Sequence, residues 1–192
     1  MIEGQTILPA LRDMRDLEKF VTGPFKIGVL LEVHVARLDV VFRLLAAHDK
    51  LVFVHLDLIQ GLKADEYATE YICQTYRPYG VISTKASVIL KAKQKQVKTV
   101  QRLFLIDSSS LDRSYRLIKR TQPDYIEVLP GLVPKYIRSV KAETGIPVFA
   151  GGLISSHEEV EAALEAGATV VTTSDQNLWS NGTDLFSKKS GM

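Results

Sequence analysis

Two segments in the C-terminal part of the chain carry residue types that bind a small anion. Residues 147–154 contain two adjacent glycines, and residues 170–175 contain adjacent hydroxyl side chains. Glycine lets the backbone approach a ligand closely, and backbone amides at the start of a following helix point toward an anion. A tight turn without a ligand is the alternative explanation for the glycine pair. The residues expected to hold a phosphate group are Gly151, Gly152, Thr173 and Ser174.

Polar side chains end several apolar runs, where predicted strands would open to solvent. Such a set binds a polyol through hydrogen bonds or supplies a general acid and a general base. A structural network of salt bridges is the alternative. No residue pair has a spacing typical of metal ligands, and the sequence contains no nucleophile elbow, dinucleotide-binding loop or P-loop. The polar residues at the strand ends are Glu32, Asp57, Ser83, Lys85, Arg102 and Glu127.

Positive charge is concentrated in one stretch of the chain. Residues 85–141 contain 13 Lys and Arg but 4 Asp and Glu, although the whole chain has a formal charge of +2. Ten of these cations fall on the fourth, fifth and sixth expected helices or at their ends, and the solvent faces of these helices would merge into a surface suited to a phosphate backbone. Ordinary solvated lysines are the alternative. We term this surface the basic wall: Lys91, Lys95, Lys98, Arg113, Arg116, Lys119, Arg120, Lys135, Arg138 and Lys141.

The elements that must position these residues alternate regularly. Each apolar run of strand type is followed by a helical pattern, which favours parallel strands with crossover helices. Eight such units predict a small (β/α)8 barrel, but 192 residues leave 24 per unit, so an open doubly wound parallel sheet is the alternative. The expected strands span residues 7–11, 27–33, 51–59, 80–83, 99–106, 125–129, 148–150 and 170–173.

Capping residues predict where two of the helices begin or end. Ser156 with Glu159 has the spacing of a capping box, and Pro134 and Gly145 are expected to open and close another helix.

Side-chain alternation predicts which strand residues face the barrel interior. In the third strand these are Phe53, His55 and Asp57. In the second strand the same reasoning turns Gly28, Leu30, Glu32 and His34 inward, and Ile27, Val29, Leu31 and Val33 toward the helices.

Composition favours one soluble domain over residues 1–192. The chain is 46% hydrophobic and 24% charged, and it has neither a signal-peptide region nor an apolar run of the roughly 18 to 20 residues that a membrane span needs. The single cysteine, Cys73, excludes an intramolecular disulfide and fits a reducing compartment. We therefore expect a cytoplasmic protein whose tail, residues 180–192, is frayed.

Five segments form a set of motifs that follow one another along the chain: residues 55–62 (HLDLIQGL), 80–84 (GVIST), 101–107 (QRLFLID), 123–131 (PDYIEVLPG) and 150–154 (AGGLI). Together they resemble one family, the glycerol uptake operon antiterminator regulatory proteins. The resemblance extends from about Ile7 to Trp179, and several motifs in order make it more specific than any single motif.

The resemblance implies a barrel fold and a non-enzymatic regulator without a cofactor. With its effector glycerol 3-phosphate bound, such a protein binds the leader RNA of glycerol-metabolism transcripts and prevents termination. The phosphate would lie at the glycine and hydroxyl residues above, and Asp57, Arg102 and Glu127 are candidates for the glycerol end. The basic wall would hold RNA, and a homodimer is expected. The alternative is a barrel enzyme acting on a small phosphorylated sugar or triose, with Asp57, Lys85 and Glu127 as acid and base.

Overall fold

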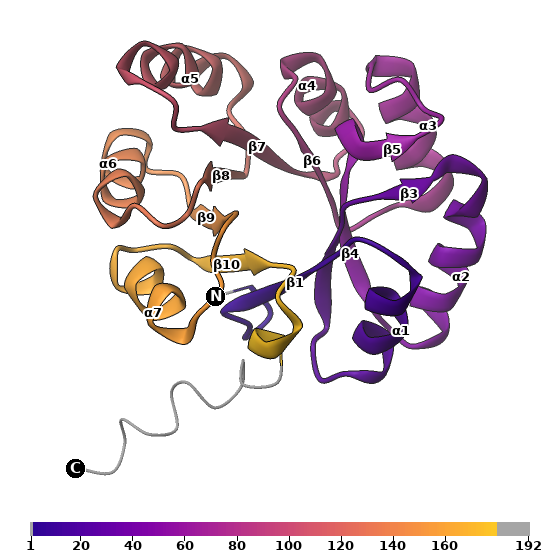
Figure 1. Ribbon diagram of the computed structural model, residues 1–192. Coiled ribbons are helices and arrows are strands. Elements are labelled where there is room, and N and C mark those ends of the chain that lie inside the picture. Colours follow the sequence, from indigo (N-terminus) through magenta and orange to yellow (C-terminus); the bar gives the residue numbers. More distant parts are fainter. Residues whose placement is uncertain (1, 180–192) are drawn as a thin grey trace.

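The computed structural model describes residues 2–179, and in this part eight parallel strands close into a barrel surrounded by helices (Figure 1). The predicted barrel is therefore confirmed, and the open sheet is wrong. The neighbouring strands follow the order β1-β10-β9-β8-β7-β6-β4-β2. These strands are β1 (Ile7–Leu11), β2 (Ile27–Leu30), β4 (Leu51–His55), β6 (Gly80–Ser83), β7 (Lys98–Phe104), β8 (Tyr125–Leu129), β9 (Val148–Gly151) and β10 (Val170–Thr173).

Short helices explain how the barrel fits into so few residues. The α-helices range from 9 to 14 residues, and short 3-10 helices at Val35–Arg37, Leu56–Leu58 and Gln176–Trp179 replace longer connections. A two-stranded sheet pairs β3 (Val33–His34) with β5 (Ile59–Gln60). The helices are α1 (Met14–Thr22), α2 (Leu38–Ala47), α3 (Glu66–Tyr76), α4 (Ala86–Gln94), α5 (Ser108–Thr121), α6 (Pro134–Thr144) and α7 (His157–Glu165).

The predicted helix ends are confirmed. Ser156 and Glu159 form a capping box at the start of α7, and Pro134 opens α6. Gly145 ends α6 with a φ of 67°, a left-handed conformation that glycine adopts without steric cost. None of the described helices is long and apolar enough to cross a membrane. The expectation for residues 180–192 lies outside the described part of the chain.

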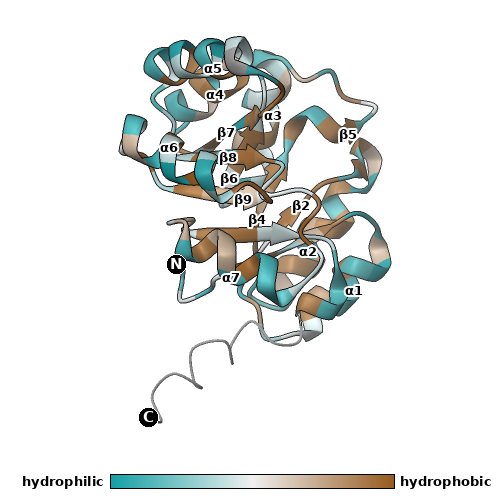
Figure 2. Cartoon of the chain, turned by 60° about the vertical axis from the view of Figure 1, so that its left-hand side comes forward, coloured by the Kyte–Doolittle hydropathy of each residue, from teal (hydrophilic) through white to brown (hydrophobic). Residues whose placement is uncertain are grey.

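Two apolar layers hold the barrel together. The outer layer lies between strands and helices, and the inner layer fills the barrel with side chains such as Phe53 and Phe149, whose ring centres are 5.7 Å apart. Figure 2 shows the hydrophobic strands inside and hydrophilic surface along α5. Cys73 lies on the buried face of α3, and burial raises the pKa of its thiol to about 11. The inner layer forms a solid floor beneath the open end of the barrel.

The predicted facing of the second strand is wrong. Ile27 and Val29 belong to the inner layer, whereas Leu30 packs in the outer layer. Gly28 also faces outward, because a Cβ there would lie 3.1 Å from the ring of Phe20 in α1. The polar residues used to set the alternation lie beyond Leu30, where the strand has already ended.

The predicted facing of the third strand is confirmed as far as that strand extends. Phe53 lies in the inner layer, and Val52 and Val54 lie in the outer layer. Because β4 ends at His55 and the chain turns into a 3-10 helix, the alternation does not continue to Asp57.

Candidate functional site

A cavity of about 790 Å³ opens at the end of the barrel where the strands finish, and we term it the mouth cavity. Its walls come from both ends of the chain, because β1 pairs with both β10 and β2. Three of the four predicted phosphate residues, Gly152, Thr173 and Ser174, line it, and so do Arg102 and Glu127. The structure therefore brings three of the four predicted phosphate residues and two of the three predicted glycerol residues to one hollow.

Gly151 lies behind this cavity and has a steric role. It is buried and faces the barrel interior, where a Cβ would lie 2.3 Å from Thr172 Oγ1 and 2.6 Å from Glu127 Oε1. Any larger residue would displace these side chains. The glycine is thus required by the packing of the cavity floor, which is a different role from the one the sequence suggested.

The loop after β9 has an unusual backbone. Gly152 and Leu153 both have positive φ, 75° and 63°, in succession. The amides of Ser155 and Ser156 donate to Glu159 Oε2 at 2.8 and 3.1 Å, so the cap of α7 already uses them. An anion in this loop is therefore left with the amides that precede Ser155, those of Gly152, Leu153 and Ile154.

The hydroxyl of Thr173 joins this loop to the end of β10. Thr173 Oγ1 donates to the carbonyl of Ile154 at 3.0 Å and accepts from the amide of Asp175 at 3.1 Å. Asp175 Oδ1 in turn accepts from the amide of Asn177 at 2.9 Å, which gives this carboxylate a local role as a cap. Thr173 fixes the shape of the cavity edge, and Ser174 stands next to it on the cavity wall.

A buried polar network forms the inner end of the cavity. Arg102 Nε lies 2.8 Å from Glu127 Oε2, and Thr172 Oγ1 donates to Glu127 Oε1 at 2.7 Å. Arg102 Nη1 lies 2.6 Å from His55 Nε2. Because a guanidinium is always a donor, Nε2 accepts and the imidazole is neutral, with its proton on Nδ1. Burial, reinforced by the charge of Arg102, lowers the pKa of His55 to about 4.

Asp57 is not part of this network. Its carboxylate accepts from Ser83 Oγ at 2.5 Å, from the amide of Thr84 at 2.7 Å and from Thr84 Oγ1 at 2.8 Å. Lys85 is also engaged, because its Nζ donates to the carbonyl of Ala64 at 3.0 Å. These residues tie the loops after β4 and β6 together, and Asp57 does not line the mouth cavity.

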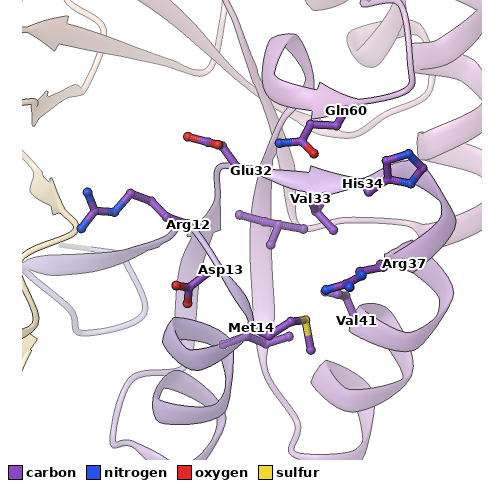
Figure 3. Close-up of a pocket in the computed structure, with 11 residues that line it drawn as sticks. Arg12, Asp13, Met14, Glu32, Val33, His34, Arg37, Val41 and Gln60 are labelled. Carbon is purple, nitrogen blue, oxygen red and sulfur yellow. The ribbon is translucent and has the colours of Figure 1, made fainter.

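Sequence reasoning missed Arg12. This residue follows β1 directly and lines both the mouth cavity and a neighbouring cavity of about 430 Å³, which Glu32, His34 and Gln60 also line. Figure 3 shows its guanidinium extending away from the other labelled residues, toward the yellow ribbon of the last strand. Among the described residues, no carboxylate forms an ion pair with Arg12. The signal was present, since Arg12 is the first charged residue after an apolar run.

The basic wall divides into engaged and exposed cations. Lys91 of α4 and Lys95, the C-cap residue of that helix, both form ion pairs with Glu70 of α3, which lowers the pKa of that carboxyl. Lys98 donates to the hydroxyl of Tyr79, and Lys141 donates to the carbonyl of Gly167. The remaining cations lie exposed on α5 and α6: Arg113, Arg116, Lys119, Arg120, Lys135 and Arg138.

Comparisons with known proteins agree with this geometry. The family model of the glycerol-3-phosphate responsive antiterminators matches residues 7–179. A glycerol uptake operon antiterminator regulatory protein from Listeria monocytogenes str. 4b F2365 is 41% identical, with a TM-score of 0.91 over 93% of this chain and 97% of that chain. A glycerol uptake operon antiterminator-related protein from Thermotoga maritima MSB8 is 29% identical, with a TM-score of 0.81 over 92% and 98%. The aldolase QR15, 14% identical with a TM-score of 0.72 over 96% and 100%, shares the fold alone.

Proposed function

The chain belongs to the family of glycerol-3-phosphate responsive antiterminators, and from this premise we propose how it senses its effector and what it binds in response. Glycerol 3-phosphate occupies the mouth cavity, and the effector-bound protein binds the leader RNA of glycerol uptake and metabolism genes and prevents termination. The observation that carries this proposal is the mouth cavity itself. Arg12, which forms no ion pair among the described residues, and the loop at Gly152 lie at one end of the cavity. The pair of Arg102 and Glu127, a donor beside an acceptor, lies at the other end.

The two ends of the effector match the two ends of the cavity. The phosphate lies by the amides of Gly152 and Leu153 and by Ser174, where the guanidinium of Arg12 neutralises its charge. Glycerol hydroxyls both donate and accept hydrogen bonds, and Arg102 beside Glu127 offers a donor and an acceptor together. The carboxylate of Asp57 lies outside the cavity and already accepts three hydrogen bonds, so we assign it no ligand.

A binding role without turnover is supported by the state of the titratable groups. Efficient proton transfer requires a pKa near the working pH, and the pKa of His55 is about 4. Glu127 is held between Arg102 and Thr172, and Lys85 is engaged with a carbonyl. None of these groups is therefore arranged to exchange protons with a ligand in the mouth cavity.

The effector site is tested by calorimetric titration with glycerol 3-phosphate. Gly152→Val places a branched side chain at a left-handed position whose Cβ would lie 3.1 Å from Leu129 Cδ2, so the loop must move and binding is lost. Gly145→Val is the matched control, since Gly145 has φ +67 with nothing within 4 Å of its Cβ. Unchanged affinity in Gly152→Val would refute the phosphate assignment.

RNA binding is tested by the anisotropy of a labelled leader RNA over a salt series, with and without glycerol 3-phosphate. We expect the effector to tighten binding and the affinity to fall steeply with salt, because phosphate contacts release counterions. Arg116→Gln with Arg120→Gln should flatten the salt dependence, whereas Arg43→Gln, an exposed arginine of α2, should not. Absence of effector-enhanced binding by the wild-type protein would refute the regulatory role. Sedimentation tests the proposed homodimer.

A further inference from the structure

Four large apolar side chains are exposed together beside the mouth cavity, and we term them the apolar rim. They are Phe104, Ile106, Leu132 and Leu153, with 47%, 79%, 37% and 75% of their surfaces exposed. Phe104 is the last residue of β7, and the other three lie in the loops that follow the adjacent strands β7, β8 and β9. A grouped set of exposed apolar residues on a folded protein marks a binding surface, whereas scattered ones need no explanation.

Backbone hydrogen bonds connect the segments at the ends of β7, β8 and β9 to one another. The amide of Leu105 donates to the carbonyl of Leu129 at 2.8 Å, and the amide of Gly131 donates to the carbonyl of Gly151 at 2.6 Å. Leu153 is held at a φ of 63°, which is unfavourable for a residue with a side chain. A strained backbone that presents an exposed leucine is expected at a binding site.

The charge of the surface around the apolar rim indicates which kind of molecule binds there. Helices α5 and α6 start from the same loops, and they carry the exposed cations of the basic wall, including Arg113, Arg116 and Lys135. Two copies of the chain meeting on this face would bring like charges together. Single-stranded RNA fits both features, because its phosphates are anionic and its unstacked bases pack on aromatic and apolar side chains.

We propose that the apolar rim receives unstacked bases of the leader RNA while the exposed cations of α5 and α6 hold its phosphates. The inference rests on the proposed RNA-binding function and adds the surface that reads the bases. Phe104 supplies the stacking ring, and the guanidinium carbon of Arg102 lies 5.8 Å from its centre. Ile106, Leu132 and Leu153 supply the apolar contacts around it.

The rim also connects RNA to the effector. Leu153 belongs to the rim and lines the mouth cavity, next to Gly152. An effector held by this loop fixes the position of Leu153, and RNA bound to Leu153 fixes the loop in return. Such coupling is reciprocal, so leader RNA tightens the binding of glycerol 3-phosphate by the same factor by which the effector tightens RNA binding.

Two variants test the rim with a labelled leader RNA at saturating glycerol 3-phosphate. Phe104→Ala removes the stacking ring, and Leu153→Gly removes an exposed side chain while relieving the backbone, so folding is preserved. Gln96→Gly is the matched control, since Gln96 is exposed and also has a positive φ, 58°. We expect each rim variant to weaken RNA binding by about tenfold or more, because base stacking contributes strongly to affinity.

The salt dependence separates the rim from the basic wall. Rim variants should weaken binding with an unchanged salt slope, because apolar contacts release no counterions. The same RNA annealed to its complement should bind wild type and rim variants equally. Wild-type binding that both rim variants retain would overturn the inference and leave the proposed function intact, whereas a wild type without RNA binding would refute the function itself. Rim variants that dissociate a dimer but keep their RNA affinity would assign the rim to a second copy and overturn the inference.

Discussion

The buried imidazole of His55 gives the sharpest prediction on stability. Its side chain is enclosed in the barrel, and its pKa is lowered from 6.5 to about 4, mainly by burial and further by Arg102. Between these two values the unfolded chain binds a proton that the folded chain does not. Stability that is fully present above about pH 6.5 is therefore lost as the pH falls toward 4. From pH 7.5 to pH 5 the loss amounts to about 2 kcal/mol.

Urea denaturation at pH 5, 6 and 7.5 measures this loss. His55→Gln retains an acceptor for Arg102 but does not titrate, so its free energy of unfolding should vary less with pH than that of the wild type. The difference between pH 7.5 and pH 5 should shrink by about 2 kcal/mol. His48→Gln, which removes an exposed histidine, is the control and should keep the wild-type pH dependence. Parallel curves for wild type and His55→Gln would refute a neutral, buried imidazole.

Three further substitutions test the packing of the barrel and its loops, each by urea denaturation. Gly80→Ala places a Cβ 2.3 Å from Phe53 Cδ1 and should lower the free energy of unfolding by about 1–3 kcal/mol; an unchanged value would contradict the tight inner layer. Asp57→Ala removes the acceptor of two hydroxyls and an amide and should cost about 1–3 kcal/mol, with a smaller loss in Asp57→Asn. Ser156→Ala removes the N-cap of α7 and should cost about 1 kcal/mol, so wild-type stability would argue against that cap.

Strand positions were predictable because each strand is a short apolar run between turn or cap residues. Four of the eight barrel strands, at residues 7–11, 80–83, 125–129 and 170–173, have the predicted bounds. The second strand shows the limit of this reasoning. An uninterrupted apolar run does not reveal which residues face the barrel interior and which face the helices. The polar residues on which the prediction was based lie beyond the end of the strand.

The site was predictable in its location but not in its contacts. In a parallel barrel, inward-facing polar residues from the middle of the strands onward meet at one mouth, so Arg102, Glu127, Thr173 and Ser174 could be grouped from sequence. The partners of Asp57 could not, because they depend on how two loops pack together. Nor does a sequence reveal that Gly151 leaves room for Thr172 and Glu127, since that requires the distance between neighbouring strands.

The geometry also limits where an effector can influence RNA. The two close-packed layers of the barrel resist rearrangement, so we expect a change between states to arise in the loops. The loop at residues 151–154 borders the mouth cavity, contributes Leu153 to the apolar rim and is tied to its neighbours through Thr173 and Gly131. Coupling free energies are typically about 1–3 kcal/mol, and a few hydrogen bonds and one strained residue supply an energy of that size. The proposed coupling therefore predicts that this loop moves and that the barrel does not.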